Sequence, residues 1–419
     1  MTDRSHALSP LAAYTQWVAA CSDAGWHGDG AAAVEQVSVQ AALGRVTAAA
    51  VRARWPSPRF ACAAMDGIAI AVSDAGGLAG DGPVVLPASA FTWVDTGDPL
   101  PAGMDTVVEH ERVVFADGNA VVSGAAAGGR NVRAAGEDFQ AGQLLVPAGR
   151  RLRPADLGAV AAAGYAALPV ARQPAVAIIP TGDEIRPVGA VLGPGEFTDS
   201  NSVMLAALAA RAGAVPAVTD VQPDDPDVLA AVTREAAGAA DLVLVLAGSS
   251  RGRGDYTATV LAQVGGLAVH GIAVRPGHPV LLGHVKPGRS GYCPPGAAGR
   301  AAGAVPAIGV PGYPLAAAVI FELFAAPLLA RLQGALAQDR TPLRARLGCD
   351  WASPAGVEDW VPVSLTAVPD QLPVAVPSEG HGAGSISRLA RADAWWRIPI
   401  GQGHFAEGHL IDVLPIAAG

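Results

Sequence analysis

The chain has 419 residues, of which 51% are hydrophobic and 16% are charged. This length exceeds what one hydrophobic core supports, and this composition excludes a disordered chain, so we expect a globular protein of several domains. The formal net charge of -9 argues against a nucleic-acid partner, although a local basic patch could still hold a small anion.

Cysteine usage and hydropathy predict the compartment. The four cysteines are far apart and form no CxxC pair, which favours a reducing compartment and neither a zinc site nor a disulfide framework. The N-terminus lacks the apolar region of a signal peptide. The longest apolar run, 314–332, contains Glu322 and Pro327 and is typical of a buried helix. We therefore predict a cytoplasmic protein without a membrane span.

The first 170 residues mix helical and β patterns. Apolar residues at helical spacing predict a helix over 9–24, and the stretch 37–51 is interpreted as a short helix that runs into a strand. Short apolar runs separated by Gly, Pro and Asp over 54–140 predict a β-rich region. A further helix is predicted over 152–163, opened by Pro154.

From about residue 174 the pattern alternates between strand and helix. Strand, helix, strand, helix and strand in succession predict a parallel, doubly wound sheet. Ligands bind beyond the carboxyl ends of the strands in such sheets. Three successive predicted strands end in loops that carry acids or hydroxyls, the first of them at Thr181. We therefore expect Glu184, Asp224 and Asp255 to meet in one crevice.

The stretch 243–256 joins a buried aliphatic run to a predicted helix through a turn rich in glycine and serine. Gly248, Ser249 and Ser250 would direct backbone N–H groups at one spot, which suits an anion, and Asp255 could hold a metal ion. An ordinary loop with a capping aspartate remains the alternative from these residues alone.

Two stiff turns follow the same sheet. Arg275 and His278 stand in a Pro/Gly turn that offers a cation and a titratable ring, and Pro311 and Pro314 frame a second turn from a strand into a helix. The Gly/Pro/Ala-rich stretch 286–305 between them is interpreted as a surface insertion in a hairpin.

Three further polar positions allow two interpretations each. Asp66 precedes Gly67 in a tight turn, either a plain Asx turn or part of a site. Asp138 follows Gly136 and Glu137 near two arginines, and it belongs either to a surface salt-bridge cluster or to a site. Ser385 lies in a glycine-rich loop that is either ordinary or an anion donor. That loop belongs to a last region of about 80 residues whose alternation predicts a small β-barrel or sandwich.

Blocks along nearly the whole chain resemble the molybdopterin molybdenumtransferase family, which comprises MoeA and the E domain of gephyrin-like proteins. Many blocks in the right order make this signal far more specific than any single motif. The blocks are AMDGIAI (64–70), DTGDPLPAGMDTVVEHE (95–111), GRNVRAAGEDFQAGQLLVPAG (129–149), IIPTGDEI (178–185), DSNS (199–202), DDP (224–226), GDYT (254–257), RPGHP (275–279) and VPGYP (310–314).

The resemblance implies a multidomain α/β plus β fold and a homodimer. Each active site would lie between the doubly wound domain of one subunit and the β-rich domain of the other. The implied domains are a small discontinuous linking domain (34–53 and 141–173), a β-rich inserted domain (54–140), a molybdopterin-binding doubly wound α/β domain (8–33 and 174–335) and a C-terminal β-barrel domain (340–419).

The implied reaction inserts molybdenum from molybdate into adenylylated molybdopterin and releases AMP, with a divalent cation such as Mg²⁺. Hard carboxylate oxygens suit that cation, and N–H-rich turns suit the phosphate and molybdate anions. The implied catalytic residues are Asp66, Glu184, Asp224 and Asp255, the last three also as metal ligands. The implied residues for binding the molybdopterin substrate are Thr96, Asp138, Thr181, Gly248, Ser249, Ser250, Arg275, His278, Pro311, Pro314 and Ser385.

The sequence also departs from the family pattern near the implied site. The loop before Asp255 carries Arg251 and Arg253, and the two lysines of the family's KPGKP-like block are Arg275 and His278 here. Arginine does not replace lysine neutrally. An alternative is therefore a non-catalytic protein that binds molybdopterin or the finished cofactor for delivery or sensing, and another is a tungsten-inserting variant. Other cofactor-biosynthesis proteins are candidate partners.

Overall fold

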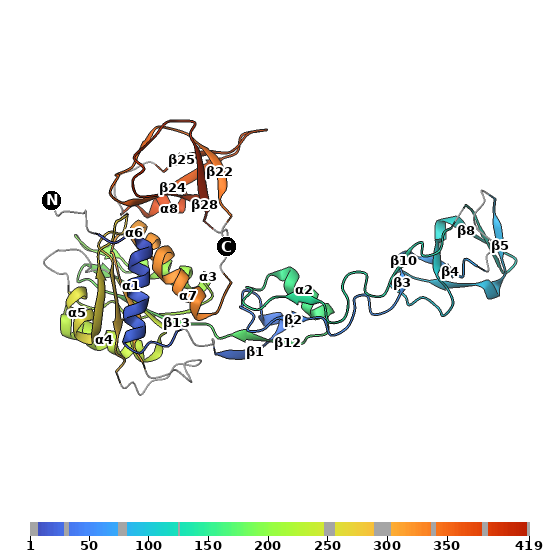
Figure 1. The fold of residues 1–419 in the computed structure, drawn as a ribbon, viewed down its shortest axis with the longest axis horizontal. Helices are drawn as coiled ribbons and strands as arrows, with labels where there is room; N and C mark the ends of the chain where they lie inside the picture. Colours follow the sequence, from blue (N-terminus) through green and yellow to red (C-terminus); the bar gives the residue numbers. More distant parts are fainter. Residues whose placement is uncertain are drawn as a thin grey trace. The chain divides into compact units, whose positions relative to one another are not determined.

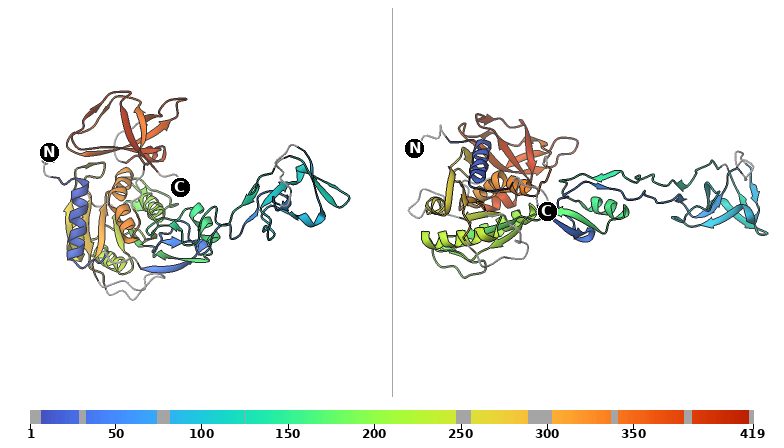
Figure 2. Two further views of the ribbon diagram at one scale, coloured as in Figure 1. Left: turned by 45° about the vertical axis from the view of Figure 1, so that its right-hand side comes forward. Right: turned by 60° about the horizontal axis from the view of Figure 1, so that its bottom comes forward.

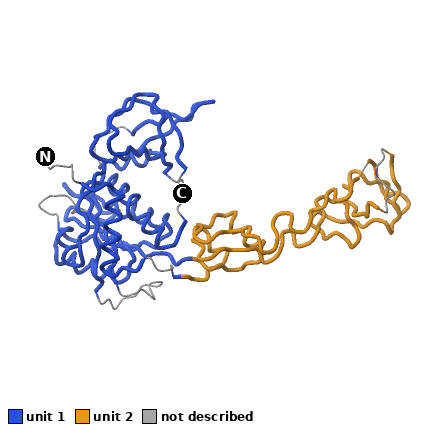
Figure 3. Tube along the Cα trace, viewed as in Figure 1, with its two compact units in different colours: residues 1–33, 171–419 blue, residues 34–170 orange. Residues whose placement is uncertain are grey.

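The computed structural model describes residues 7–28, 33–73, 82–124, 126–246, 256–288, 303–336, 341–378 and 384–416. The chain forms two compact units, one of residues 1–33 with 171–419 and one of residues 34–170, coloured separately in Figure 3. Each unit has its own hydrophobic clusters and is described by itself.

A six-stranded sheet forms the centre of the first unit. Its strands are β13 (Ala175–Pro180), β16 (Val215–Val218), β17 (Leu242–Leu246), β18 (Gly265–His270), β20 (Leu281–Val285) and β21 (Val305–Val310), in the spatial order β16-β13-β17-β21-β20-β18. The first four strands in that order are parallel, and β20 and β18 are antiparallel additions at one edge. The predicted doubly wound parallel sheet is confirmed.

Helices cover both faces of this sheet (Figures 1 and 2). They are α1 (Pro10–Asp23), α3 (Asn201–Arg211), α4 (Pro226–Ala239), α5 (Thr257–Val264), α6 (Pro314–Ile320) and α7 (Ala326–Leu332). Val176 and Ile178 of β13 pack in the cluster with α1, α3, α6 and α7, whereas Ala177 and Ile179 pack in the cluster with α4 and α5. Side chains alternate between faces along a strand, so a continuous aliphatic run is what a sheet covered on both faces requires.

The apolar stretch 314–332 is a core helix, as predicted. A π-helical segment, η5 (Phe321–Ala325), joins α6 to α7 and accommodates Pro327, which cannot donate a backbone hydrogen bond. Among the described residues this is the one helix whose length and hydropathy would suffice to cross a membrane, and 61% of it is buried within the fold.

A closed five-stranded barrel follows, as one of the two predicted alternatives. Its strands pair in the cycle β24-β25-β22-β28-β26, and β26 returns to β24. The elements are β22 (Leu343–Leu347), β23 (Trp351–Ala352), β24 (Glu358–Thr366), β25 (Val374–Pro377), α8 (Ile386–Ala390), β26 (Ala394–Ile398), β27 (His404–Phe405) and β28 (Leu410–Pro415). Closure leaves no free sheet edge in this cycle, and Val363, Trp396 and Val413 fill the interior.

The second unit contains two three-stranded antiparallel sheets, β6-β4-β7 and β5-β9-β8, and three strand pairs, β1-β12, β2-β11 and β3-β10. Its bounds are β1 (Val34–Ser38), η2 (Val39–Ala41), β2 (Val51–Arg52), β3 (Cys62–Ala63), β4 (Gly67–Ile70), β5 (Val84–Leu86), η3 (Ala88–Ala90), β6 (Phe91–Val94), β7 (Thr106–Glu109), η4 (His110–Arg112), β8 (Val113–Ala116), β9 (Asn119–Val122), β10 (Val132–Arg133), β11 (Leu144–Val146), α2 (Pro154–Ala162) and β12 (Ala167–Ala171). The finer division of this unit into a linking and an inserted domain stays a prediction.

Two expectations about local structure were wrong. In place of the helix expected in 37–51 there is a single 3-10 turn, η2, although a strand does begin at Val51 as expected. The flanks of this stretch pair with distant strands, β1 with β12, and Val51 and Arg52 with β11. Asp224, expected directly at the end of a strand, is separated from it: β16 ends at Val218, and a turn carries the chain on from there to α4.

Two short pairs complete the first unit. β14 (Ile185–Arg186) pairs with β15 (Phe197–Thr198) after β13. β19 (Val274–Arg275), which lies within the implied range of the doubly wound domain, pairs in parallel with Glu358 and Asp359 of the barrel strand β24. The stretch 286–305 does join the arms of the antiparallel pair β20 and β21, as predicted, although residues 289–302 lie outside the described part.

Candidate functional site at the carboxyl edge of the parallel sheet

The carboxyl ends of β13 and β17 lie side by side where the connections of the sheet reverse direction. β13 leads through α3 to β16 on one side, and α4 then returns the chain to β17 on the other. The buried hydroxyl of Thr181 donates a hydrogen bond to the carbonyl oxygen of Leu246 at 2.7 Å and ties the two strand ends together. Such a reversal point is where open α/β sheets bind their ligands.

The turn after β16 lies against the end of β13. The backbone N–H of Gln222 donates to Pro180 at 2.8 Å, and that of Gly182 donates to Gln222 at 3.2 Å. The backbone N–H of Asp224 then donates to the Asp183 carboxylate at 3.2 Å. These bonds bring Asp224 beside the acids that follow β13, as the sequence predicted for Glu184 and Asp224.

The carboxylates of Asp183, Glu184 and Asp224 lie close enough for their charges to interact. Partial burial raises the pKa of Asp224 above its usual value, and the negative charges of Asp183 and Glu184 raise it further. Like charges held close together disfavour ionisation unless a cation joins them. Asp183 was missing from the predicted site, although it adjoins Glu184 in the same block.

A complete metal centre is not assembled by the described residues. No group of three or more His, Cys, Asp or Glu side chains among them could hold a metal ion. The predicted third ligand, Asp255, lies outside the described residues, as do Gly248, Ser249 and Ser250. The same holds for Arg251 and Arg253.

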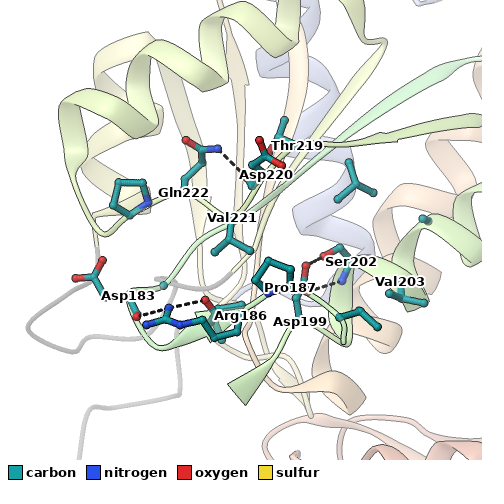
Figure 4. A pocket seen from close by; sticks show the side chains of 16 residues that line it. Asp183, Arg186, Pro187, Asp199, Ser202, Val203, Thr219, Asp220, Val221 and Gln222 are labelled. Carbon is teal, nitrogen blue, oxygen red and sulfur yellow. Dashed lines mark hydrogen bonds between the residues drawn. The ribbon is translucent and has the colours of Figure 1, made fainter. Parts of the chain in front are cut away.

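We call the segments that carry Asp183, Glu184 and Asp224 the acidic turn. A cavity of about 1040 Å³ opens beside it (Figure 4). Its lining combines Asp183, Asp220 and the start of α3 with the apolar side chains of Val203 and Val218. The Asp199 carboxylate accepts from the backbone N–H of Ser202 at 3.0 Å and from its hydroxyl, which fixes the first turn of α3. The cavity therefore offers one apolar wall and one polar, acidic rim.

A second cavity, of about 570 Å³, lies between the turn after β19, the turn after β21 and the barrel. It contains three predicted site residues, Arg275, His278 and Pro311, together with Arg388 of the barrel helix α8. The Nε of Arg275 donates to Asp359 at 2.8 Å, and its Nη2 donates to the other oxygen of the same carboxylate. The sequence had indicated neither Arg388 nor Asp359 as members of this site.

The remaining predicted positions around the second cavity come from two elements. Pro314 begins α6, and the preceding turn is held by Asn201, whose side-chain amide donates to the Gly312 carbonyl at 2.7 Å. Ser385 precedes α8, and its hydroxyl lies 3.2 Å from that of Ser387. A Cβ built on the neighbouring Gly384 would approach the Tyr313 ring to 3.3 Å, so these two loops contact each other.

The other predicted residues belong to the second unit. The Asp66 carboxylate accepts hydrogen bonds from the backbone N–H and the hydroxyl of Thr96, both at 2.7 Å. Both bonds lower the pKa of Asp66 below its usual value, and the bond from the hydroxyl has the larger effect. Asp138 instead interacts with Arg133, which also pairs with Glu137. Asp66 and Thr96 thus form one polar pair, whereas Asp138 belongs to a separate charged cluster.

Family models match three successive parts of the chain. They are described as MoeA N-terminal region (domain I and II), over residues 10–164, probable molybdopterin binding domain, over 177–331, and MoeA C-terminal region (domain IV), over 344–416. Fold and matches together define a protein built like MoeA, with the acidic turn and both cavities inside the matched segments.

Relatives and a solved structure match most of the chain. The chain is 31% identical over 342 residues to molybdopterin molybdenumtransferase 2 of Mycobacterium tuberculosis, covering 76% of this chain and 80% of the relative. It is 29% identical to molybdopterin molybdenumtransferase of Nostoc sp., and the match covers 91% of this chain and 88% of that relative. A crystal structure of a molybdopterin biosynthesis MoeA protein from Pyrococcus horikosii superposes with a TM-score of 0.76 at 27% identity, covering 99% of this chain and 100% of that one. The chain belongs to the molybdopterin molybdenumtransferase family, as its sequence blocks predicted.

Proposed function

We propose that this protein is a transferase of molybdenum cofactor biosynthesis that inserts molybdenum from molybdate into adenylylated molybdopterin and releases AMP. Family membership supports the enzyme over a protein that only binds the cofactor. The observation that carries the proposal is the acidic turn at the carboxyl edge of the sheet, where Asp224 lies against Asp183 and Glu184.

The two cavities suit the two parts of such a substrate pair. The larger cavity, with its apolar wall beside the acidic turn, is of a size that accepts a drug-sized heterocycle. The smaller cavity carries Arg275 and Arg388, whose charges suit an oxyanion. It is also lined by Trp351, whose buried Nε1 has no hydrogen-bond acceptor among the described residues. β17 ends between the strands that border the two cavities.

A divalent cation at the acidic turn would relieve the repulsion by which the charges of Asp183 and Glu184 raise the pKa of Asp224, and carboxylate oxygens are hard ligands of the kind such a cation takes. Glu184 and Asp224 would hold Mg²⁺, together with Asp255. When bound, the ion would neutralise negative charge that develops as the phosphoanhydride is cleaved. The carboxylates themselves would orient the attacking water, and Thr181 would keep the ends of β13 and β17 at a fixed separation.

We further propose, as the family resemblance implies, that the active protein is a homodimer whose site is completed by Asp66 and Thr96 of the partner's second unit. The short hydrogen bonds between these two residues hold the Asp66 carboxylate ionised and in one orientation. An ionised, oriented carboxylate is suited to accept a proton or to bind a cation.

The experiment uses the purified chain with adenylylated molybdopterin, molybdate and Mg²⁺, and follows AMP release by chromatography. We expect release that depends on both molybdate and Mg²⁺. Substrate binding without AMP release, under conditions in which a relative turns over, would overturn the enzyme and leave the binding protein. Tungstate in place of molybdate tests the tungsten-inserting variant in the same assay.

A further inference from the structure

The turn that carries Arg275 and His278 is fixed from both ends and from the barrel. The backbone N–H of Gly271 donates to Val280 at 2.8 Å, and that of Ile272 donates to His278 at 3.0 Å, which closes the turn on itself. The Nδ1 of His278 lies 2.5 Å from the Ile272 carbonyl oxygen. The backbone N–H of Glu358 in the barrel donates to Ala273 at 2.9 Å.

Arg275 receives the strongest of these constraints. Asp359 is buried, and its carboxylate accepts hydrogen bonds from both the Nε and the Nη2 of the Arg275 guanidinium. Two such bonds fix the plane and the direction of an arginine side chain. The hydroxyl of Ser353 donates to the same carboxylate at 3.0 Å, so Asp359 is itself held in place. No described residue accepts a hydrogen bond from the Nη1 of Arg275, and Arg275 lines the smaller cavity.

We propose that Asp359 is a positioning residue, through which the barrel orients Arg275 so that its Nη1 edge serves the oxyanion in the smaller cavity. The inference rests on the proposed function for the identity of the anion. Asp359 itself does not bind the substrate: its carboxylate would repel an anion. Its contribution is orientation, since a fixed donor loses less conformational freedom when the anion binds.

The sign of one substitution separates positioning from simple charge neutralisation. Asp359→Asn removes a negative charge from the cavity wall, so electrostatics alone predicts tighter anion binding. Positioning predicts the opposite, because the guanidinium loses its two-bond anchor and becomes mobile. We expect Asp359→Asn to weaken molybdate binding about tenfold, the size of effect expected from a charge-assisted hydrogen bond.

Three further variants make the test specific. Arg275→Lys keeps the positive charge but cannot make the two-bond contact, and it should weaken molybdate binding in the same direction. Ser353→Ala should have a smaller effect of the same sign. Asp412→Asn is the matched control, because it removes a carboxylate from an exposed ion pair with Arg344 on the same barrel and should leave binding unchanged.

The measurements are equilibrium dialysis of molybdate against each full-length variant, and the KM for molybdate in the AMP-release assay. Circular dichroism and thermal unfolding check that each variant is folded. If Asp359→Asn does not fold, the molybdate binding of Arg275→Lys decides the test. A rise in dissociation constant and KM with kcat nearly unchanged supports positioning. Equal or tighter binding by folded Asp359→Asn, or no molybdate binding by the unsubstituted protein, would overturn it. If the unsubstituted protein binds molybdate but releases no AMP, the proposed function fails, and the dialysis series still decides the role of Asp359.

Discussion

The hydroxyl of Thr181, just after β13, donates a hydrogen bond to the carbonyl oxygen of Leu246 at the end of β17, with 2.7 Å between the two oxygen atoms. This bond extends the parallel pairing of the two strands, which reaches Pro180 and Leu246, to the point where the sheet reverses its winding. The acidic turn lies directly beyond it, and the residues after Leu246 carry the predicted Asp255. Thr181 is therefore a structural link between two halves of the candidate site.

Replacing Thr181 by valine should test that link. Valine keeps the shape but removes the donor, so the buried carbonyl of Leu246 loses one partner. We expect the free energy of unfolding to fall by about 1–2 kcal/mol and kcat for AMP release to fall several-fold. Denaturant unfolding and steady-state kinetics measure the two effects. Thr181→Ser retains the hydroxyl, and a loss of activity equal to that of the valine variant would argue against the hydrogen bond as the cause.

The repulsion within the acidic turn predicts a pH-dependent response to metal. The folded-state pKa of Asp224 is raised, so the folded protein without metal loses stability as pH rises through that pKa and regains it as pH falls. Mg²⁺ should therefore raise the melting temperature more at neutral pH than at acidic pH. Thermal unfolding with and without Mg²⁺ across this pH range measures the difference.

Asp183→Asn removes one of the two charges that raise the pKa of Asp224. We expect this variant to melt at a higher temperature than the unsubstituted protein when metal is absent at neutral pH. Its gain should shrink in acid, where Asp224 is protonated in both proteins. A gain that is independent of pH would point to a cause other than charge repulsion.

The Asp66–Thr96 pair makes a prediction of the opposite sign. The hydroxyl of Thr96 lowers the pKa of Asp66, so its contribution to stability is present above the unfolded pKa and is lost as pH falls through the folded one. Thr96→Val should move the pKa of Asp66 upward, and Thr96→Ser should not. Carbon-detected NMR titration of the Asp66 carboxyl measures this, and an unchanged pKa in Thr96→Val would show that the backbone N–H suffices.

Gly67 should tolerate no side chain. A Cβ built there would lie 1.9 Å from the carbonyl oxygen of Val108, where β4 pairs with β7. Gly67→Ala must therefore separate these strands, and it should lower the melting temperature and disturb the adjacent Asp66. The matched control is Gly158→Ala in α2, where a Cβ meets nothing within 4 Å and alanine should stabilise the helix by about 0.5–1 kcal/mol. Equal melting temperatures for the two variants would contradict this account of Gly67.

Local patterns were enough to predict the doubly wound sheet. The aliphatic run of β17 and the cap of α4 are signals of that kind: Asp225 accepts hydrogen bonds from the backbone N–H groups of Asp227 and Val228 just where Pro226 opens the helix. The stretch 37–51 could not be predicted in this way, because its conformation depends on β11 and β12, which are distant in the sequence.

The site was predictable to the extent that its residues follow strands of the sheet. Glu184 and Asp224 were expected at one edge because parallel strands end there, and in the structure the charge of Glu184 acts on Asp224. Their part in a reaction stays a prediction. The partner of Arg275 was not predicted, because Asp359 is 84 positions away and on the barrel, and β24 reads from sequence only as an apolar strand. Arg388 was missed for a different reason: α8 is a five-residue helix, too short to show a periodic pattern.

The proposed reaction depends most directly on the carboxylate of Asp224. The decisive measurement is AMP release by Asp224→Asn, with adenylylated molybdopterin binding measured on the same sample. Asp227→Asn, an exposed acid three residues away, is the control. We predict that Asp224→Asn loses at least about tenfold in kcat, which corresponds to roughly 1.4 kcal/mol of transition-state stabilisation, while it binds substrate nearly as well as the control. Turnover by Asp224→Asn equal to that of Asp227→Asn would contradict the assignment of the acidic turn to the reaction.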